Sequence, residues 1–462
     1  MDILGKSLTQ LKSDLSDKKV SPSELCKYFI QRSQKYNKDL NVYITIMGND
    51  EGKSGGLLAG LPLSIKDNYC TYGVRTTASA LVLDGFVPAY DATVISRLKK
   101  EGATFVGKTN MDAWAHGSST ETSDYGPTHN PWDTTRAPGG SSGGSAASVA
   151  AGLAPASMGS ETAGSIRQPA AWCGIVGLKP TYGRVSRYGV VAMGSSFDCP
   201  GPMTNYTEDA ALLLQAVAGH DPYDATSSSV APDNYVEELK KKKRFTIGIS
   251  DEYLEGVDSE TKQNFEDTVE ILEKLGHTVK KIKLISPSYS ISVFTILQRA
   301  EVSSNLARYD GIRYGAGRAA FGEEAQKRIM LGTYTLSHGY YDAYYKKAQK
   351  VRALIIADFE RVFKDVDLIF APTSPVPALE LGEFKKYPFF GEQMDILNEP
   401  AAAAGIPAIN IPTGLTKSGL PIGMQIMGRH FAESDTLNLA YQFEQETKFF
   451  GMRERIIEKY KD

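Results

Sequence analysis

The sequence predicts an α/β protein with a mixed, largely buried β-sheet, built as a single domain over residues 1–462. Short apolar segments of strand type alternate with amphipathic helical segments along the whole length, which is the pattern of α/β folds. A chain of this length can hold one large domain or two to three ordinary ones. Neither an internal repeat nor a low-complexity linker interrupts the alternation, so we expect one domain.

The first predicted helix and strands can be recognised from the residues at their ends. Ser21-Pro22-Ser23-Glu24 combines an N-cap serine, a proline in the first helical turn and a capping-box glutamate, and apolar residues follow at helical spacing. Residues 42–46 alternate as a strand does. Residues 61–65 form a short apolar strand, which leads directly into Lys66.

The following elements continue the alternation. We expect Asp91 to cap a helix that carries Val94, Ile95 and Leu98 and ends at Gly102. Further strands are predicted at residues 103–106, 245–249, 368–371, 406–411 and 420–427.

The composition narrows the class of protein. Hydrophobic residues make up 42% and the net charge is -3, which fits a globular protein that does not itself attract nucleic acid or an anionic membrane. No apolar run has the roughly 18 residues needed to span a membrane, and the start resembles no signal or transit peptide. We expect a cytoplasmic protein if it is bacterial, and a mitochondrial or other organellar matrix protein if it is eukaryotic. The four cysteines are widely spaced, which argues against disulfides and a metal site: Cys26, Cys70, Cys173 and Cys199.

Residues 138–170 consist mainly of glycine, serine and alanine. Ordering so much glycine costs backbone entropy, and close approach of the backbone to a ligand is the usual reason for it. A flexible linker is the alternative. Linkers of this kind do not carry residues such as Ile166, Arg167 and Trp172, so we interpret the segment as part of a site.

Two short motifs, one before this segment and one inside it, match known patterns in their letters only. Residues 102–109 satisfy GxxxxGK[ST], the phosphate-binding loop, but their Ala-Thr-Phe-Val core should form the strand itself. Residues 140–144 satisfy GxSxG, the nucleophile elbow, which requires a strand running into the serine. Turn-forming residues precede it here, so neither motif is supported by its context.

Three residues form a longer pattern: Lys66 ends a strand, Ser141 opens SSGGS, and Ser165 ends SETAGS. Together with WCGIVGLKPTYGRVSRYGVV downstream, this pattern resembles the amidase-signature family, in detail from about residue 66 to 202. The resemblance implies a single amidase-signature domain with a large mixed twisted β-sheet flanked by helices on both faces. It also implies hydrolysis of an amide by a Ser-Ser-Lys triad.

The chemistry explains why such a triad needs a buried lysine. A serine hydroxyl attacks an amide only when a base removes its proton, and a lysine is a base only when burial lowers its pKa. The resemblance implies that Lys66 is this base, that Ser141 follows a cis peptide bond and relays the proton, and that Ser165 is the nucleophile. It places the oxyanion hole at four backbone amides, those of Thr162, Ala163, Gly164 and Ser165.

The sequence departs from the family pattern at several positions. The family commonly has Asp-Thr-Gly-Gly-Ser where this chain has Glu161-Thr162-Ala163-Gly164-Ser165. The added methyl of Ala163 is harmful only if that position needs a positive φ. The family usually has methionine where this chain has His116.

Four further segments resemble the GatA-type glutaminase subunits of tRNA-dependent amidotransferases: residues 108–133, 303–315, 327–352 and 419–428. Glutamine carries an α-carboxylate and an α-ammonium, which need an arginine and an acidic residue. By resemblance these are Arg328 and Asp395. Taken alone, the two residues also fit a surface arginine and an ordinary N-cap aspartate.

The resemblance implies hydrolysis of glutamine to supply ammonia for converting Glu-tRNA(Gln) to Gln-tRNA(Gln). It implies a GatB-type partner subunit that uses ATP and Mg²⁺, a small GatC-type subunit, and a mischarged tRNA held by the complex. The chain itself would need no cofactor. Two other functions remain open from the residues: a stand-alone amidase for another small carboxamide, and a scaffold subunit without activity.

Overall fold

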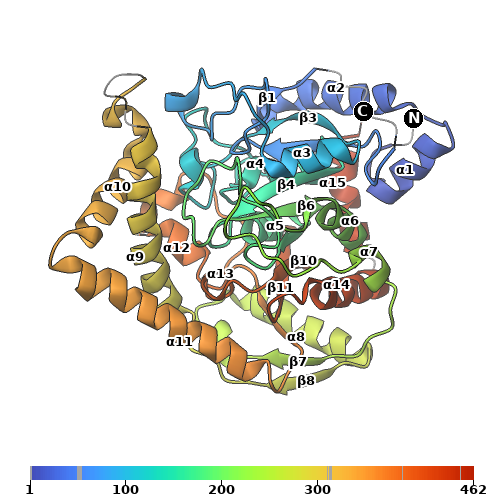
Figure 1. The fold of residues 1–462 in the computed structure, drawn as a ribbon. Helices are drawn as coiled ribbons and strands as arrows, with labels where there is room; N and C mark the ends of the chain where they lie inside the picture. The colour runs from blue at the N-terminus through green and yellow to red at the C-terminus, as the bar shows by residue number, and fades with distance from the viewer. Residues whose placement is uncertain are drawn as a thin grey trace.

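The computed structural model describes residues 3–48, 55–309, 311, 315–387, 389–447 and 449–461. Of the 303–315 segment, residues 310 and 312–314 lie outside the described residues. A mixed sheet of eleven strands runs through the described chain in the order β1-β3-β2-β4-β6-β5-β10-β11-β9-β7-β8 (Figure 1). The strands are β1 (Tyr43–Ile46), β2 (Pro62–Lys66), β3 (Thr104–Thr109), β4 (Ala156–Glu161), β5 (Val176–Lys179), β6 (Cys199–Thr204), β7 (Thr246–Ile249), β8 (Thr278–Lys281), β9 (Leu368–Pro372), β10 (Ala408–Leu415) and β11 (Pro421–Gly428).

The sheet is mixed as predicted. Strand β2 is parallel to both β3 and β4, and β7 is parallel to both β8 and β9, whereas the other neighbours are antiparallel. The helices are α1 (Leu8–Ser16), α2 (Pro22–Leu40), α3 (Thr93–Lys100), α4 (Gly143–Ala150), α5 (Arg167–Cys173), α6 (Thr207–Val217), α7 (Tyr235–Glu238), α8 (Ser259–Lys274), α9 (Ser288–Asn305), α10 (Glu323–Leu336), α11 (Lys347–Val362), α12 (Phe390–Met394), α13 (Glu399–Ala404), α14 (Glu433–Thr447) and α15 (Glu454–Lys459).

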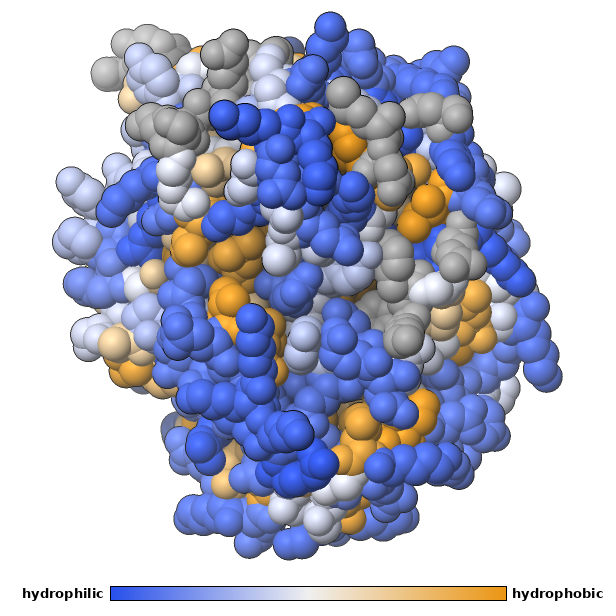
Figure 2. Space-filling view, turned by 90° about the vertical axis from the view of Figure 1, so that its right-hand side faces the viewer, coloured by the Kyte–Doolittle hydropathy of each residue, from blue (hydrophilic) through white to orange (hydrophobic). Residues whose placement is uncertain are grey.

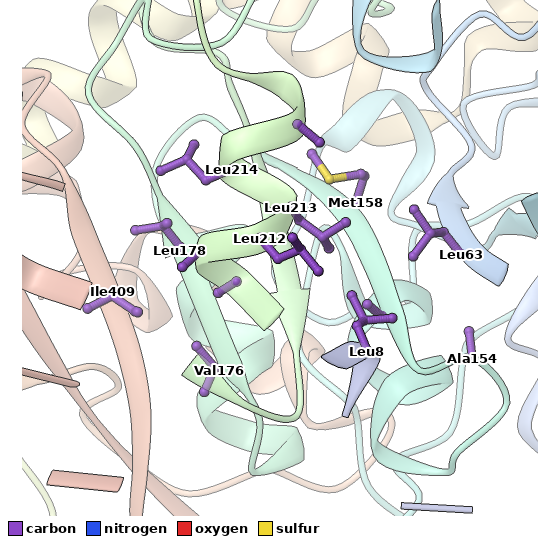
Figure 3. Close-up of a cluster of buried hydrophobic side chains, with 14 of the residues drawn as sticks. Leu8, Leu63, Ala154, Met158, Val176, Leu178, Leu212, Leu213, Leu214 and Ile409 are labelled. Atoms are coloured by element: carbon purple, nitrogen blue, oxygen red, sulfur yellow. The ribbon is translucent and has the colours of Figure 1, made fainter. Parts of the chain in front are cut away.

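Helices cover both faces of the sheet, as expected. Alternate side chains of β9 enter two different hydrophobic clusters, because successive residues of a strand point to opposite faces. Leu368 and Phe370 join the cluster that contains side chains of α6, α8 and α14. Ile369 and Ala371 join the cluster that contains side chains of α9, α11 and α13. Figure 3 shows the leucines of α6 facing side chains from the strands.

Helices α9, α10 and α11 form a projecting side of the molecule, which we call the helical arm (yellow to orange in Figure 1). Helix α9 packs against both α10 and α11, and also against α13 near the sheet. On the opposite side, the surface is mostly hydrophilic and its apolar groups lie in separate patches (Figure 2). No helix in the described ranges is long and apolar enough to cross a membrane.

Most predicted elements are present. Helix α2 begins at Pro22 with the predicted capping box, and β2 ends at Lys66. Gly107, Lys108 and Thr109 lie inside β3, so residues 102–109 form no phosphate-binding loop. The predicted cap of α3 is wrong. That helix begins at Thr93 without a side-chain cap, because Asp91 instead accepts a hydrogen bond from the backbone of Tyr72 and pairs with Lys99.

Sequence analysis missed three central strands, β4, β5 and β6. Strand β6 reads Cys-Pro-Gly-Pro-Met-Thr and β4 reads Ala-Ser-Met-Gly-Ser-Glu, and both are rich in residues that are uncommon in strands. Every residue of these two strands is buried. Packing between neighbouring strands therefore outweighs the local preference of the residues.

Candidate active site

Lys66 lies at the carboxyl end of β2, beside the loop that follows β4, because these neighbouring strands are parallel and end at the same edge. Its side chain is completely buried. The Nζ atom donates hydrogen bonds to Ser141 Oγ at 2.7 Å and to the Ser160 carbonyl at 3.0 Å. Burial lowers the pKa of Lys66 to about 7. Three buried carboxylates oppose this shift: Asp112, Asp198 and Glu161.

Ser141 lies in the turn before α4 and follows a cis peptide bond from Gly140. Gly140 is required here because a Cβ atom would lie 2.0 Å from Asp112 Oδ2. Asp112 is itself fixed by the Thr120 amide at 2.9 Å and by the Thr122 hydroxyl at 2.8 Å. This carboxylate, which the sequence analysis missed, packs against Gly140, next to the serine that contacts Lys66.

Ser165 lies in the loop between β4 and α5. Its carbonyl accepts a hydrogen bond from the Ser142 amide at 3.2 Å, which joins this loop to the Ser141 turn. Among the described residues, the Ser165 hydroxyl has no hydrogen-bond partner, and the residue is 4% exposed. The structure thus places Lys66 against Ser141 and joins the Ser165 loop to the Ser141 turn, and no described hydrogen bond occupies the Ser165 hydroxyl.

The backbone N–H groups of four consecutive residues donate no hydrogen bond within the described chain. These residues are Thr162, Ala163, Gly164 and Ser165. The next two amides, of Ile166 and Arg167, both bind Glu161 Oε2 at 3.1 Å. Unpaired amides in a buried loop are costly unless they meet a ligand, so this loop can accept a negatively charged oxygen.

The departure at Ala163 fits the structure. Ala163 does not adopt a positive φ, so its methyl group brings no backbone strain. Its carbonyl accepts a hydrogen bond from Arg167 Nη2 at 2.9 Å. Gly164, in contrast, has no room for a side chain, because a Cβ atom there would lie 2.1 Å from Asp395 Oδ1 and 2.8 Å from Asn398 Nδ2.

Asp395 lies against this loop from the other side. It follows α12 as its C-cap, and the N-cap of α13 is Asn398, so Asp395 is no N-cap aspartate. Its Oδ2 accepts the Ser118 hydroxyl at 2.9 Å, whereas its Oδ1 has no partner among the described residues. Burial raises the pKa of Asp395 well above its usual range. An unpaired buried carboxyl oxygen next to the Ser165 loop is suited to receive a cation.

Arg328 lines a cavity of about 710 Å³ beneath α10 and α12. It is 5% exposed, which excludes an ordinary surface arginine. Its Nε donates to Glu324 at 2.6 Å, and no described residue bonds its two Nη atoms. Ser118 lines the same cavity and binds Asp395, so the cavity leads from Arg328 toward the catalytic loop. No described hydrogen bond joins Arg328 directly to that loop.

The comparisons with known proteins agree with this geometry. The chain belongs to the amidase family, whose family model matches residues 24–437. It is 48% identical over 468 residues to the A subunit of the glutamyl-tRNA(Gln) amidotransferase of Halothermothrix orenii, covering 96% of this chain and 98% of the relative. It is 46% identical to the protein of the same name from a Geobacillus species, covering 97% and 99%.

Solved structures of amidase-family proteins have the same fold as this chain. The crystal structure of the glutamyl-tRNA(Gln) amidotransferase A subunit from Thermotoga maritima superposes with a TM-score of 0.83 at 40% identity, covering 93% of this chain and 92% of that one. A 6-aminohexanoate cyclic dimer hydrolase superposes with a TM-score of 0.90 at 25% identity, covering 99% and 100%. The predicted resemblance to the family and to its GatA-type members is confirmed.

Proposed function

We propose that this chain is the glutaminase subunit, of the GatA type, of a glutamyl-tRNA(Gln) amidotransferase. The likeness to known A subunits over 96% of the chain is the observation that supports this assignment most strongly. The cluster of Lys66, Ser141 and Ser165 supports amide hydrolysis as its reaction. A stand-alone amidase is less well supported, because eight relatives at 44–48% identity are each named as A subunits.

The first half of the reaction makes the nucleophile. Unprotonated Lys66 takes the proton of Ser141 as Ser141 takes the proton of Ser165, whose Oγ then bonds to the side-chain carbonyl carbon of glutamine. A pKa of about 7 leaves a large fraction of Lys66 unprotonated at neutral pH. The carbonyl oxygen becomes negative and is stabilised by the free amides of the loop, where one donor contributes about 3–4 kcal/mol.

The second half releases ammonia. The proton returns through Ser141 to the leaving nitrogen, the C–N bond breaks, and a γ-glutamyl ester remains on Ser165. Water then adds to the ester with Lys66 and Ser141 again moving the proton, and glutamate leaves.

Two charged residues orient the substrate in this proposal. The unbonded Nη atoms of Arg328 bind the α-carboxylate of glutamine as a charge-assisted pair. The unpaired Oδ1 of Asp395 binds the α-ammonium. An adjacent ammonium favours the ionised carboxyl and so offsets the effect of burial on the pKa of Asp395.

The partners and the compartment also belong to the proposal. The ammonia passes to a GatB-type subunit, which uses ATP and Mg²⁺ to activate the glutamate on the mischarged tRNA, and a small GatC-type subunit completes the complex. A net charge of -3 supports the view that a partner, rather than this chain, provides the basic surface for the tRNA. The complex would work in the cytoplasm of a bacterium, or in an organellar matrix if the source is eukaryotic.

Ammonia release from glutamine tests the assignment. We expect the chain alone to hydrolyse glutamine slowly, and a GatB-type partner with Glu-tRNA(Gln) and ATP to accelerate it by favouring the competent geometry of the Ser165 loop. The same complex carrying Ser165→Ala measures ammonia from any other source. Full activity of the chain alone, with no response to partner, tRNA or ATP, would instead indicate a stand-alone amidase.

A further inference from the structure

His116 is a buried histidine whose ring has no partner in the described structure. It is 1% exposed, and neither Nδ1 nor Nε2 forms a hydrogen bond with a described residue. A buried polar group without a partner is costly and calls for an explanation. The two preceding residues, Trp114 and Ala115, have φ values of 59° and 64°, a conformation that side chains disfavour and that recurs at ligand sites.

His116 is one of the residues that line the cavity of Arg328. Burial holds the pKa of His116 well below its usual range, and the positive charges of Arg328 and Arg299 lower it further. The imidazole is therefore neutral at pH 7, with one N–H donor and one acceptor nitrogen.

Two ion pairs leave some of the cavity's donors free. Arg299 Nη2 binds Glu392 Oε1 at 2.6 Å, and Arg328 Nε binds Glu324 Oε1 at 2.6 Å. Arg299 Nε has no partner among the described residues. The cavity is also lined by the carboxylates Glu324 and Glu392, but each of these is paired with one of the two arginines. The N–H groups that the arginines keep free can bind an anion.

We propose that His116 determines substrate specificity by donating a ring N–H hydrogen bond to the α-carboxylate of the bound amino acid, next to Arg328. The inference rests on the proposed hydrolysis of glutamine. An amide that lacks the α-carboxylate leaves this donor unpaired, so the histidine favours glutamine over neutral amides. Methionine, which the family usually has at this position, cannot donate such a bond.

The experiment compares two substrates that differ in one group. Glutamine and 4-aminobutanamide, which is glutamine without its α-carboxylate, are hydrolysed by the parent chain and by His116→Met, each assembled with its partner subunits. We expect His116→Met to raise KM for glutamine about 10- to 100-fold with kcat little changed, as for loss of a hydrogen bond to a charged group. The kcat/KM for 4-aminobutanamide should stay the same.

Two further variants complete the test. His116→Gln keeps an N–H donor and should recover part of the loss, whereas Leu354→Ala, an exposed position on α11 outside this cavity, should have no effect on KM. Equal losses on both amides, or an unchanged KM for glutamine, would overturn the role of His116. A parent complex that hydrolyses 4-aminobutanamide but not glutamine would overturn the proposed function, and the inference with it.

Discussion

Arg167 and Glu161 form an ion pair in which neither side chain is exposed to solvent. Arg167 Nε donates to Glu161 Oε1 at 2.9 Å, and the second carboxylate oxygen binds the two amides at the start of α5. The pair thus holds the ends of the loop that carries Ser165, which leaves the amides inside the loop free.

Replacing Arg167 with leucine should strongly destabilise the protein. Removal of one partner leaves an uncompensated buried charge on Glu161, and we expect the free energy of unfolding to fall by about 3–5 kcal/mol. Urea unfolding measures the change. Lys274→Ala, which breaks the exposed pair with Glu270, is the control and should leave the unfolding midpoint almost unchanged. A similar midpoint for both variants would contradict this role of the buried pair.

Replacing Ser165 with alanine should abolish glutamine hydrolysis and leave the fold intact, because the hydroxyl has no described partner inside the protein. Ser141→Ala and Lys66→Ala should cost about as much, and the double and triple variants little more, since the three residues act as one unit. Ammonia release measures activity, and circular dichroism measures folding. A Ser165→Ala rate above about a tenth of the parent rate would mean that another group is the nucleophile.

The rate of glutamine hydrolysis should rise with pH through about 7 and level off above it. The reactive lysine is the unprotonated one, and burial lowers the pKa of Lys66 from 10.5 to about 7, so its reactive fraction grows as pH rises through that value. The pH profile of kcat/KM, measured where the protein stays folded, locates the inflection. An inflection near 10 would show that Lys66 keeps an ordinary pKa and would remove the basis for its role as base.

Replacing Arg328 with methionine should raise KM for glutamine about 10- to 100-fold, because a charge-assisted contact with the α-carboxylate is lost. Hydrolysis of a small neutral amide should change little, since the contact is distant from the bond that breaks. Kinetics on both substrates separate the two effects. Equal losses on both would assign Arg328 to support of the cavity through Glu324.

Adjacent positions in the catalytic loop should respond in opposite ways. Gly164→Ala should reduce activity severely, because the new methyl would collide with Asp395 and Asn398 and displace the loop amides. Ala163→Gly should keep activity, since Ala163 has no positive φ and its carbonyl contact with Arg167 does not depend on the side chain. Ammonia release from the two variants, at matched folded protein, provides the comparison. Retained activity in Gly164→Ala would show that the loop can move away from Asp395.

The proposed triad was predicted from the resemblance to the amidase-signature family, and the structure places Lys66 against Ser141 and joins the Ser165 loop to the Ser141 turn. The strand ending at Lys66 was apparent from its apolar residues, and the glycine-rich segment pointed to close backbone packing around Ser141 and Ser165. The strands β4 and β6 could not be predicted, since their glycines, serines and prolines favour loops and only their neighbours make them strands.

The residues that pack around the site, Asp112 and Asp395, could not be given these structural roles from the sequence. Asp112 acts on Gly140 across a loop, and Asp395 approaches Gly164 from a distant helix, and both relations depend on the tertiary fold. The sequence did hold a signal for Asp112, because this acidic residue lies three positions after the end of β3 at Thr109. The two unpartnered nitrogens of His116 have no signal in the sequence at all, because they are defined by what surrounds them.

The residues proposed for catalysis and the arginines proposed near the substrate come from different parts of the fold. The groups proposed to break the bond come from the ends of β2 and β4 and the turns beside them, whereas Arg299 and Arg328 come from α9 and α10. On the proposed role of Arg328 in binding glutamine, substitutions in the helical arm would change which amide is accepted and leave the groups at the ends of β2 and β4 in place. Related proteins with this fold could then differ in substrate through substitutions in the cavity wall while keeping the same catalytic residues.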